Sequence, residues 1–308
     1  MRFIVWTSLI LIVVLLGSGA YGFYRVTRNL PQISSLKDYQ PSIVTNLYAD
    51  DGSLMAEYYL ERRIVVPLEK IPQTLIDAFV AAEDARFFEH EGIDFFGILR
   101  ALWKNIKARG IVQGGSTITQ QVTKSLLLTP ERSYARKLRE AILAYRIEKY
   151  LSKKEILFLY LNQIYLGHGA YGVEAAAQNY FSKNVQELEL AECAMLAGLP
   201  QAPSRYSPYS YPQRAKERQV YVLNRMVAAG YITTNEAAEA LAANLDIKAR
   251  KDWNVRSVPY FAEHIRRYLE EKYGQEVLYR EGLQVYTCLL YTSDAADDFA
   301  VVLVWGGG

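Results

Sequence analysis

Cysteine is scarce in this chain of 308 residues, which contains only Cys193 and Cys288. Two thiols so far apart in the sequence are too few for a disulfide framework or a structural zinc site. Cys193 lies in a segment rich in Ala and Leu, where we expect a small buried apolar residue. Net charge is also low, since 35 Lys and Arg nearly balance 33 Asp and Glu and leave +2. Because the net charge is so low, any concentration of cations is a local feature of the chain. No internal repeat is apparent in the sequence.

Charge is absent from Phe3 to Tyr24, a run of 22 residues. A helix of that length spans a bilayer. Ser18-Gly19-Ala20 could pass for a cleavage site, so a secretory signal peptide is the alternative. We favour an uncleaved signal anchor, because the apolar run is longer than the apolar region of a typical signal peptide. The flanking Arg2, Arg25 and Arg28 do not fix its orientation.

The rest of the chain has the composition of a globular protein. Its 51% hydrophobic content allows one domain of nearly 200 residues to bury a full core. Residues 42–67 alternate as strands do, with Asp51-Gly52 as a hairpin turn. Most of residues 72–273 is helical in pattern, ending in an amphipathic helix from Pro259 to Tyr273. A short strand is expected at Gly282–Thr287. The sequence therefore predicts a mainly α fold with a small β-hairpin element.

Residues 83–92 concentrate acidic, basic and aromatic side chains in the order Glu-Asp-Ala-Arg-Phe-Phe-Glu-His-Glu-Gly. At 3.6 residues per turn, four of them are expected on one helical face: Glu83, Arg86, Phe87 and His90. A carboxylate beside a guanidinium, an imidazole and an aromatic wall can serve as a general base. A Glu-Asp pair alone is usually a solvated helix surface, so this stretch gains its weight from its combination with the next one.

Residues 114–121 read Gly-Gly-Ser-Thr-Ile-Thr-Gln-Gln. A flexible turn followed by hydroxyls and amides offers the groups that hydrogen-bond sugars and phosphates. The alternative is a plain helix N-terminus with Ser116 as its cap. Two such stretches in this order are hard to explain by structural roles alone.

A third cluster follows, with Arg136, Lys137 and Glu140 at positions i, i+1 and i+4, so that Glu140 is expected to face both cations. Residues 131–154 hold eight Lys or Arg against three Glu, a local charge of +5. The alternative is a surface salt-bridge cluster. A cation N-terminal to Glu is the poorer orientation for helix stabilisation, and the concentration of positive charge indicates an anionic partner.

Apolar residues dominate Gly110–Leu128, among them Ile111, Val112, Ile118 and Val122. A core helix explains this pattern, and so does a segment that dips into the membrane interface.

Together the first two stretches resemble the peptidoglycan glycosyltransferase domain of class A penicillin-binding proteins and monofunctional transglycosylases. Residues 83–92 match its Glu-Asp-x-x-Phe-x-x-His-x-Gly pattern, and residues 114–121 match Gly-x-Ser-Thr-Ile-Thr-Gln-Gln. Residues 136–140 are similar to its Arg-Lys-x-x-Glu motif, and 156–162 to its Ile-Leu-x-x-Tyr-Leu-Asn segment, which we expect to be scaffold. The resemblance covers about residues 45–230.

The resemblance implies a lysozyme-like fold with two helical lobes flanking a cleft. It also implies lipid II as substrate, polymerised with inversion into β-1,4-linked glycan and with release of polyprenyl pyrophosphate. Glu83 would be the general base and Glu140 the second important carboxylate, with carboxyls on the order of 8 Å apart or more. The expected substrate contacts are Asp84, Arg86, His90, Ser116, Thr117, Gln121, Lys124, Arg136 and Lys137.

Two roles stay open for Glu140: it orients the cations, or it holds a divalent ion such as Mg or Mn near the pyrophosphate. No cofactor is otherwise required. The implied partners are lipid II, the growing lipid-linked glycan, the membrane and other cell-wall synthesis proteins, with no nucleic acid. The implied place is the bacterial cytoplasmic membrane, with a single span and the enzyme domain on the outer, periplasmic side. The alternatives are a lysozyme-like glycan-cleaving enzyme and a non-catalytic membrane-anchored scaffold.

The expected organisation is a signal anchor (1–24), a juxtamembrane linker (25–44), the glycosyltransferase domain (45–230), a connector toward a missing transpeptidase domain (231–287) and a tail (288–308). The sequence lacks the transpeptidase motifs in any segment that is expected to fold. Ser34-Ser35-Leu36-Lys37 matches the first of these motifs formally, but it lies in the linker without its partner motifs. No transpeptidase activity is therefore expected. The tail departs from the family pattern and resembles translated adapter or read-through, so we expect it to contribute nothing to the enzyme domain.

Overall fold

The computed structural model describes residues 43–107, 110, 114–128, 133–249, 258–288 and 302–305, with scattered residues between 6 and 31. The chain divides into two compact units. The first unit holds residues 1–39 and 86–156, and the second holds 40–85 and 157–308. Most of the predicted anchor, Phe3 to Tyr24, lies outside the described residues. Among the residues that are described, no helix has the length and apolar character needed to cross a membrane.

The second unit contains most of the helices of the mainly α fold that the sequence predicts. They are α2 (Gln73–Glu83), α7 (Val173–Phe181), α8 (Leu190–Gly198), α9 (Pro212–Ala228), α10 (Thr234–Ala242) and α11 (Pro259–Arg280), with short 3-10 helices η2 (Leu68–Lys70) and η3 (Val185–Glu187). Helix α6 (Lys153–Gln163) begins in the first unit and ends in the second. Loops separate these helices around Gly167 and at 200–211.

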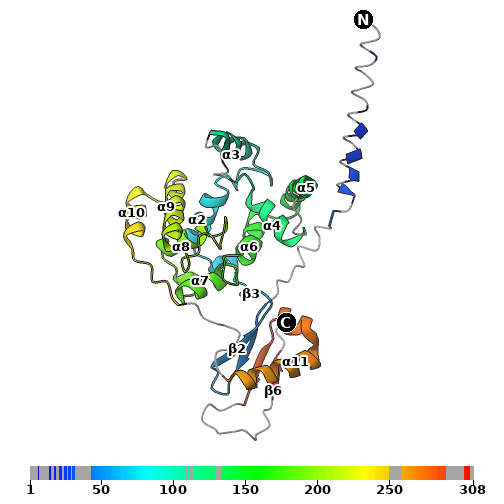
Figure 1. Cartoon of the computed structure of the whole chain (residues 1–308), viewed down its shortest axis with the longest axis vertical. Helices are drawn as coiled ribbons and strands as arrows, with labels where there is room; N and C mark the ends of the chain where they lie inside the picture. The colour runs from blue at the N-terminus through cyan, green and yellow to red at the C-terminus, as the bar shows by residue number, and fades with distance from the viewer. Residues whose placement is uncertain are drawn as a thin grey trace. The chain divides into compact units, whose positions relative to one another are not determined.

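Helices α2, α8 and α9 pack on one another and form the core of the second unit (Figure 1). Every residue of α8 from Ala191 to Gly198 is buried, which is the pattern of a helix surrounded by protein on all sides. Cys193 is among them, and burial raises the pKa of its thiol to about 12. The prediction of a buried, apolar Cys193 is therefore confirmed. Phe79 of α2 meets Tyr160 of α6 edge to face, with ring centroids 6.0 Å apart.

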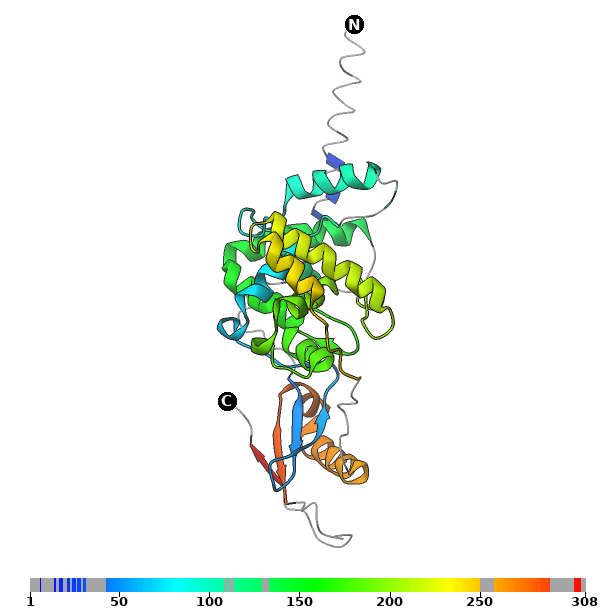
Figure 2. The same cartoon turned by 90° about the vertical axis from the view of Figure 1, so that its left-hand side faces the viewer.

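A four-stranded sheet in the order β2-β1-β5-β6 forms the other part of this unit. Strands β1 (Thr45–Tyr48) and β2 (Leu54–Tyr58) make the predicted hairpin, in which Gly52 at the turn has φ 78°. Strand β5 (Gln284–Thr287) pairs in parallel with β1. Helix α11 lies beside the sheet in both views (Figures 1 and 2). A buried cluster joins them: Leu47, Met55, Tyr58, Ala262, Ile265, Leu269 and Val285.

The predicted tail is not entirely separate from this sheet. Strand β6 (Val302–Trp305) pairs antiparallel with β5, with Gln284 opposite Trp305 and Thr287 opposite Val302. Because β5 belongs to the predicted connector (231–287), this pairing does not test the expectation that residues 288–308 contribute nothing to the enzyme domain, which stays a prediction. The pairing itself arises because β5 has an edge not occupied by β1, and Val-Leu-Val-Trp is a run with high strand propensity.

The first unit contains α3 (Phe95–Lys107), α4 (Ile118–Leu126) and α5 (Tyr134–Tyr150). Helices α4 and α5 pack together, and the Thr119 hydroxyl of α4 donates to the Glu148 carboxylate of α5 at 2.6 Å. Ile118 and Val122 are buried. Within the apolar segment 110–128 these two residues are therefore core, while Ile111 and Val112 lie outside the described residues.

The prediction of one helical face for the residues from Glu83 to His90 is wrong. Helix α2 ends at Glu83, Asp84 is its C-cap with φ −152° and ψ 71°, and the chain turns from there to His90. Contacts of the turn explain why the helix stops. Arg86 pairs with Asp94 at 3.0 Å instead of lying over α2, and Phe87 is fully buried.

A two-stranded parallel sheet of β3 (Arg62–Arg63) and β4 (Ala170–Tyr171) completes the second unit. The expected scaffold role of residues 156–162 agrees with their burial. The Asn162 side chain accepts from the Val66 backbone N–H at 2.9 Å and donates to the Val66 carbonyl at 3.0 Å. It thereby holds the segment that precedes α2 against α6.

Candidate active site

The predicted site residues belong to the two units in unequal numbers. Glu83 and Asp84 lie in the second unit, and all the others lie in the first. Each group is described by itself, and the expected separation of the Glu83 and Glu140 carboxyls stays a prediction.

In the first unit, the turn that follows the α2 helix is fixed against α5. Gly92 has φ 83°, and a Cβ at this position would lie 2.6 Å from the Ala144 carbonyl oxygen of α5. Only glycine tolerates both the conformation and the close approach. Lys153 donates to the His90 carbonyl at 2.7 Å, and its ammonium lies 4.4 Å from the centroid of the Phe87 ring. These contacts place the buried His90 beside Lys153, the first residue of α6.

Arg86 lies in the same turn and is held by two acidic side chains. Its guanidinium contacts Asp94 at 3.0 Å and Glu89 at 3.3 Å. The guanidinium carbon also lies 5.1 Å from the centroid of the exposed Phe96 ring. Within the first unit, the carboxylates of Asp94 and Glu89 therefore compensate the positive charge of Arg86.

Thr117, not Ser116, caps helix α4. The Thr117 hydroxyl accepts from the Gln120 N–H at 3.1 Å, and the Gln120 side chain accepts from the Thr117 N–H at 3.0 Å, which makes a capping box. The same hydroxyl donates to the Gly92 carbonyl at 2.7 Å and is buried. The structure thus gives Thr117 a structural role, joining the first motif to the second.

Ser116 is placed differently, because it precedes the cap and meets α5. Lys137 donates from its ammonium to the Ser116 hydroxyl at 2.8 Å. The same ammonium also contacts the Glu140 carboxylate, whose other oxygen lies 3.4 Å from a terminal nitrogen of Arg136. The predicted cluster of two cations around Glu140 is confirmed. Glu140 is buried and Lys137 is half exposed, so the lysine can meet a ligand while the carboxylate holds it.

This arrangement is suited to binding an anion. Lys137 and Ser116 lie at the N-terminus of α4, where the backbone N–H groups and the helix dipole favour negative charge. Two donors of α5 are buried without a hydrogen-bond partner in the described part of the chain, the Nε atoms of Arg136 and Arg139. Arg139 was not singled out from the sequence. Further along α4, Gln121 is half buried and Lys124 is exposed.

In the second unit, Glu83 is the last residue of α2 and its side chain is 13% exposed. The Arg218 guanidinium of α9 lies 3.9 Å from its carboxylate. Tyr160 of α6 is buried beneath, and burial raises the pKa of its phenol, with the charges of Glu83 and Asp84 adding to the effect. Its hydroxyl has no hydrogen-bond partner among the residues described. The motifs did not reveal Arg218, which lies outside them, and Tyr160 belongs to the segment 156–162, which was expected to be scaffold.

Helix α3 carries an apolar surface that sequence reasoning missed. Its large exposed side chains are Phe95, Phe96, Ile98, Leu99, Trp103 and Ile106, and most of them are more than 60% exposed. Phe95, Leu99 and Trp103 recur at four-residue spacing and therefore share one face. We call the six exposed apolar residues of α3 the α3 apolar face. Apolar surface this continuous marks an interaction site.

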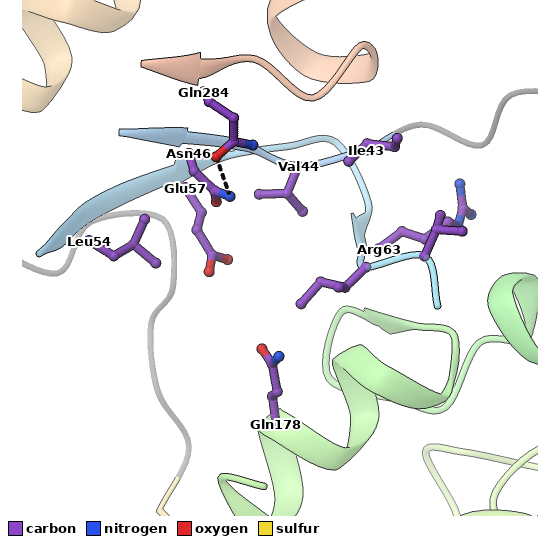
Figure 3. A pocket seen from close by; sticks show the side chains of 10 residues that line it. Ile43, Val44, Asn46, Leu54, Glu57, Arg63, Gln178 and Gln284 are labelled. Atoms are coloured by element: carbon purple, nitrogen blue, oxygen red, sulfur yellow. Dashed lines mark hydrogen bonds between the residues drawn. The ribbon is translucent and has the colours of Figure 1, made fainter. Parts of the chain in front are cut away.

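A cavity of about 420 Å³ lies in the second unit between the sheet and α7 (Figure 3). Asn46 donates to Gln284 at 3.5 Å on one wall, and Gln178 of α7 forms the opposite one. Arg62 binds two of the lining residues, the Glu57 carboxylate at 2.7 Å and Gln178 at 2.7 Å. None of the predicted site residues lines this cavity, so it is not the predicted site.

Comparison with known proteins finds a family match over the region that holds the predicted site residues. The family described as "Transglycosylase" matches residues 51–227, a range that includes every predicted site residue. Penicillin-binding protein 1A of Neisseria flavescens is 48% identical over 258 residues, which are 84% of this chain and 32% of that protein. The Rickettsia conorii protein of the same name is 46% identical over 286 residues, or 91% and 36%.

A solved structure is also similar, the 2.6 Å crystal structure of penicillin-binding protein 1A from Haemophilus influenzae. It has a TM-score of 0.50 and 30% identity, and the match covers 82% of this chain and 27% of that one. The chain spans about a third of the length of these relatives. It belongs to the transglycosylase family, and the relatives it matches in their N-terminal part are named penicillin-binding protein 1A.

Proposed function

We propose that this chain is a peptidoglycan glycosyltransferase that polymerises lipid II into glycan strands. The observation that carries the proposal is the cluster at the N-terminus of α4, in which Lys137 and Arg136 contact Glu140 and Lys137 also donates to Ser116. A hydrolase acting on neutral sugar chains does not need an anion-binding site, whereas an enzyme that uses a pyrophosphate-linked donor does. The transglycosylase match over the same residues supports it.

In the proposed reaction, Glu83 takes the proton from the 4-hydroxyl of the acceptor GlcNAc as that oxygen attacks C1 of the donor MurNAc. The bond from C1 to the pyrophosphate oxygen breaks, and both electrons leave with the polyprenyl pyrophosphate. The α-linked donor thus yields a β-1,4 bond by a single inverting displacement. Lys137 and Arg136 stabilise the charge that builds on the leaving group.

Of the two roles open for Glu140, its contacts favour orientation of the cations. Both carboxylate oxygens contact Lys137 or Arg136. The described residues hold no group of three or more His, Cys, Asp or Glu able to bind a metal. A divalent ion associated with the pyrophosphate is a separate proposal, tested by titrating Mg²⁺ or a chelator into the assay.

We also propose that the first unit contacts the outer face of the bacterial cytoplasmic membrane through the α3 apolar face. Phe95, Leu99, Trp103 and Ile106 would enter the interface, where aromatic and aliphatic side chains of amphipathic helices lie. Lys107, whose ammonium lies 5.3 Å from the centroid of the Trp103 ring, would meet lipid phosphates. This proposal moves the membrane-facing surface from residues 110–128 to α3.

Replacing Leu99 and Trp103 with Gln should weaken binding to lipid vesicles about tenfold or more, because binding then no longer transfers two large apolar side chains from water into the membrane interface. Co-sedimentation with anionic vesicles measures this, using the chain without residues 1–31 so that the N-terminal apolar run does not dominate. Tyr260, which is 93% exposed on α11 in the second unit, provides the control Tyr260→Gln. Equal vesicle binding by both variants would refute the membrane role of α3.

Purified full-length chain and fluorescent lipid II test the proposed activity. Polymer on a gel together with released polyprenyl pyrophosphate is the expected result. Sacculi incubated with the same protein should stay intact. Soluble fragments from sacculi without polymer would support the glycan-cleaving alternative, and no reaction with either substrate would support the scaffold.

A further inference from the structure

Arg218 of α9 occupies a seat built for its side chain. Its Nε donates to the Gly198 carbonyl of α8 at 3.2 Å. The guanidinium carbon lies 4.1 Å from the centroid of the Tyr221 ring and 5.7 Å from that of Tyr206. Only 12% of the side chain is exposed. Stacking and a backbone acceptor together fix the plane of a guanidinium.

Gly198 is part of this seat because it lacks a side chain. A Cβ there would lie 2.8 Å from the Cγ of Arg218, so even alanine would displace the arginine. The third contact of the guanidinium is the Glu83 carboxylate at 3.9 Å. The arginine is thus held by neutral groups on two sides and presents its charge to Glu83 on the third.

Several groups near Glu83 oppose a negative charge on its side chain. Glu83 is the last residue of α2, and the C-terminal end of a helix carries negative partial charge. Asp84 follows directly and is buried, and a neighbouring carboxylate disfavours a second one. Tyr160 of α6 is buried nearby as a neutral phenol. Arg225, another cation of α9, donates to the Ala81 carbonyl of α2 at 3.1 Å and has no carboxylate partner among the described residues.

We infer that Arg218 is a positioning residue that keeps the Glu83 carboxylate ionised and oriented for proton removal. This inference rests on the proposed function, in which Glu83 is the base. An opposite charge within about 4–6 Å favours the ionised form of a carboxyl. The seat of Gly198 and Tyr221 fixes where that charge lies. Arg218 itself need not touch the substrate.

Arg218→Met tests the inference, because methionine keeps apolar contact with Tyr221 and removes the charge. We expect kcat for lipid II polymerisation to fall about 10- to 100-fold with KM nearly unchanged. The acidic limb of the kcat profile should move to higher pH by about one unit or more. Arg218→Lys should leave that limb near its original position, since the charge is kept. Arg214→Met is the control, because Arg214 of α9 also lies over a tyrosine ring, that of the N-cap residue Tyr211, but is exposed.

A double-mutant cycle separates this role from a structural one. Adding Arg218→Met to Glu83→Gln should cause no further loss, because the arginine then has no carboxylate to act through. Losses that multiply, or an unchanged pH profile, would overturn the inference. If Glu83→Gln polymerises normally, it is the proposed base that fails. Thermal melting accompanies each variant, and should Arg218→Met unfold, Arg218→Gln, which also removes the charge but keeps a donor for the Gly198 carbonyl, is used in the same cycle.

Discussion

Glu83→Gln should reduce the rate of glycan polymerisation by a factor of about 100 to 10,000, the range for loss of a general base. The amide keeps the size and shape of the carboxyl but cannot take the proton of the acceptor hydroxyl. Binding of lipid II should largely survive, because the proposed contacts of its pyrophosphate belong to Lys137, Arg136 and Ser116. Polymerisation rates and a fluorescence binding assay on the same preparation measure the two effects separately.

Glu69→Gln is the matched control, since Glu69 lies in η2 of the same unit and is exposed. Its rate should equal that of the unchanged chain. A normal rate for Glu83→Gln would remove Glu83 as the base. Equal losses of rate and of binding would instead indicate that this side chain serves the substrate complex and not the chemical step.

The sequence predicted the helical fold and the composition of the first-unit cluster well, for physical reasons that are local. Arg136, Lys137 and Glu140 lie within one helical turn or little more, so helix geometry alone brings them together. The hairpin at Asp51-Gly52 is equally local, because Gly52 supplies the positive φ that the turn requires.

What the sequence did not give depends on tertiary contacts. The helical pattern continues past Glu83, but the pairing of Arg86 with Asp94 and the burial of Phe87 favour a turn. Periodicity does not register such competition. Arg218 lies 135 residues after Glu83 and shares no motif with it, so only the packing of α9 on α2 brings the two close together.

The α3 apolar face illustrates a different limit. Phe95, Leu99 and Trp103 have the spacing of a core-facing helix, and sequence alone gives no sign that this side faces outward. The structure shows it, because the buried residue Ala101 lies on the side of α3 against which Gly115 packs. The membrane-interface alternative for residues 110–128 was based on their hydrophobic content, which does not report exposure.

Lys137→Ala should weaken lipid II binding and also lower kcat, each by about 10-fold or more and together by about 100- to 1,000-fold in kcat/KM, comparable with loss of one donor to a developing oxyanion. The reason is that the pyrophosphate carries charge both before and after transfer. Glu83→Gln, in contrast, should affect kcat alone. Titration of lipid II into each variant, followed by both binding and polymer formation, distinguishes the two patterns. Lys149→Ala is the control, because Lys149 lies on the same helix and pairs with the exposed Glu91.

Loss of Lys137 also has a structural consequence that must be separated from loss of binding. Glu140 is only 2% exposed, and without Lys137 it keeps Arg136 at 3.4 Å as its ion-pair partner among the described residues. A buried carboxylate deprived of a partner destabilises a fold. The double variant Lys137→Ala/Glu140→Gln removes that charge and should recover the melting temperature. If it recovers polymerisation as well, Lys137 serves the fold and not the pyrophosphate. We expect stability to return while activity stays low, because the amide restores packing but supplies no cation.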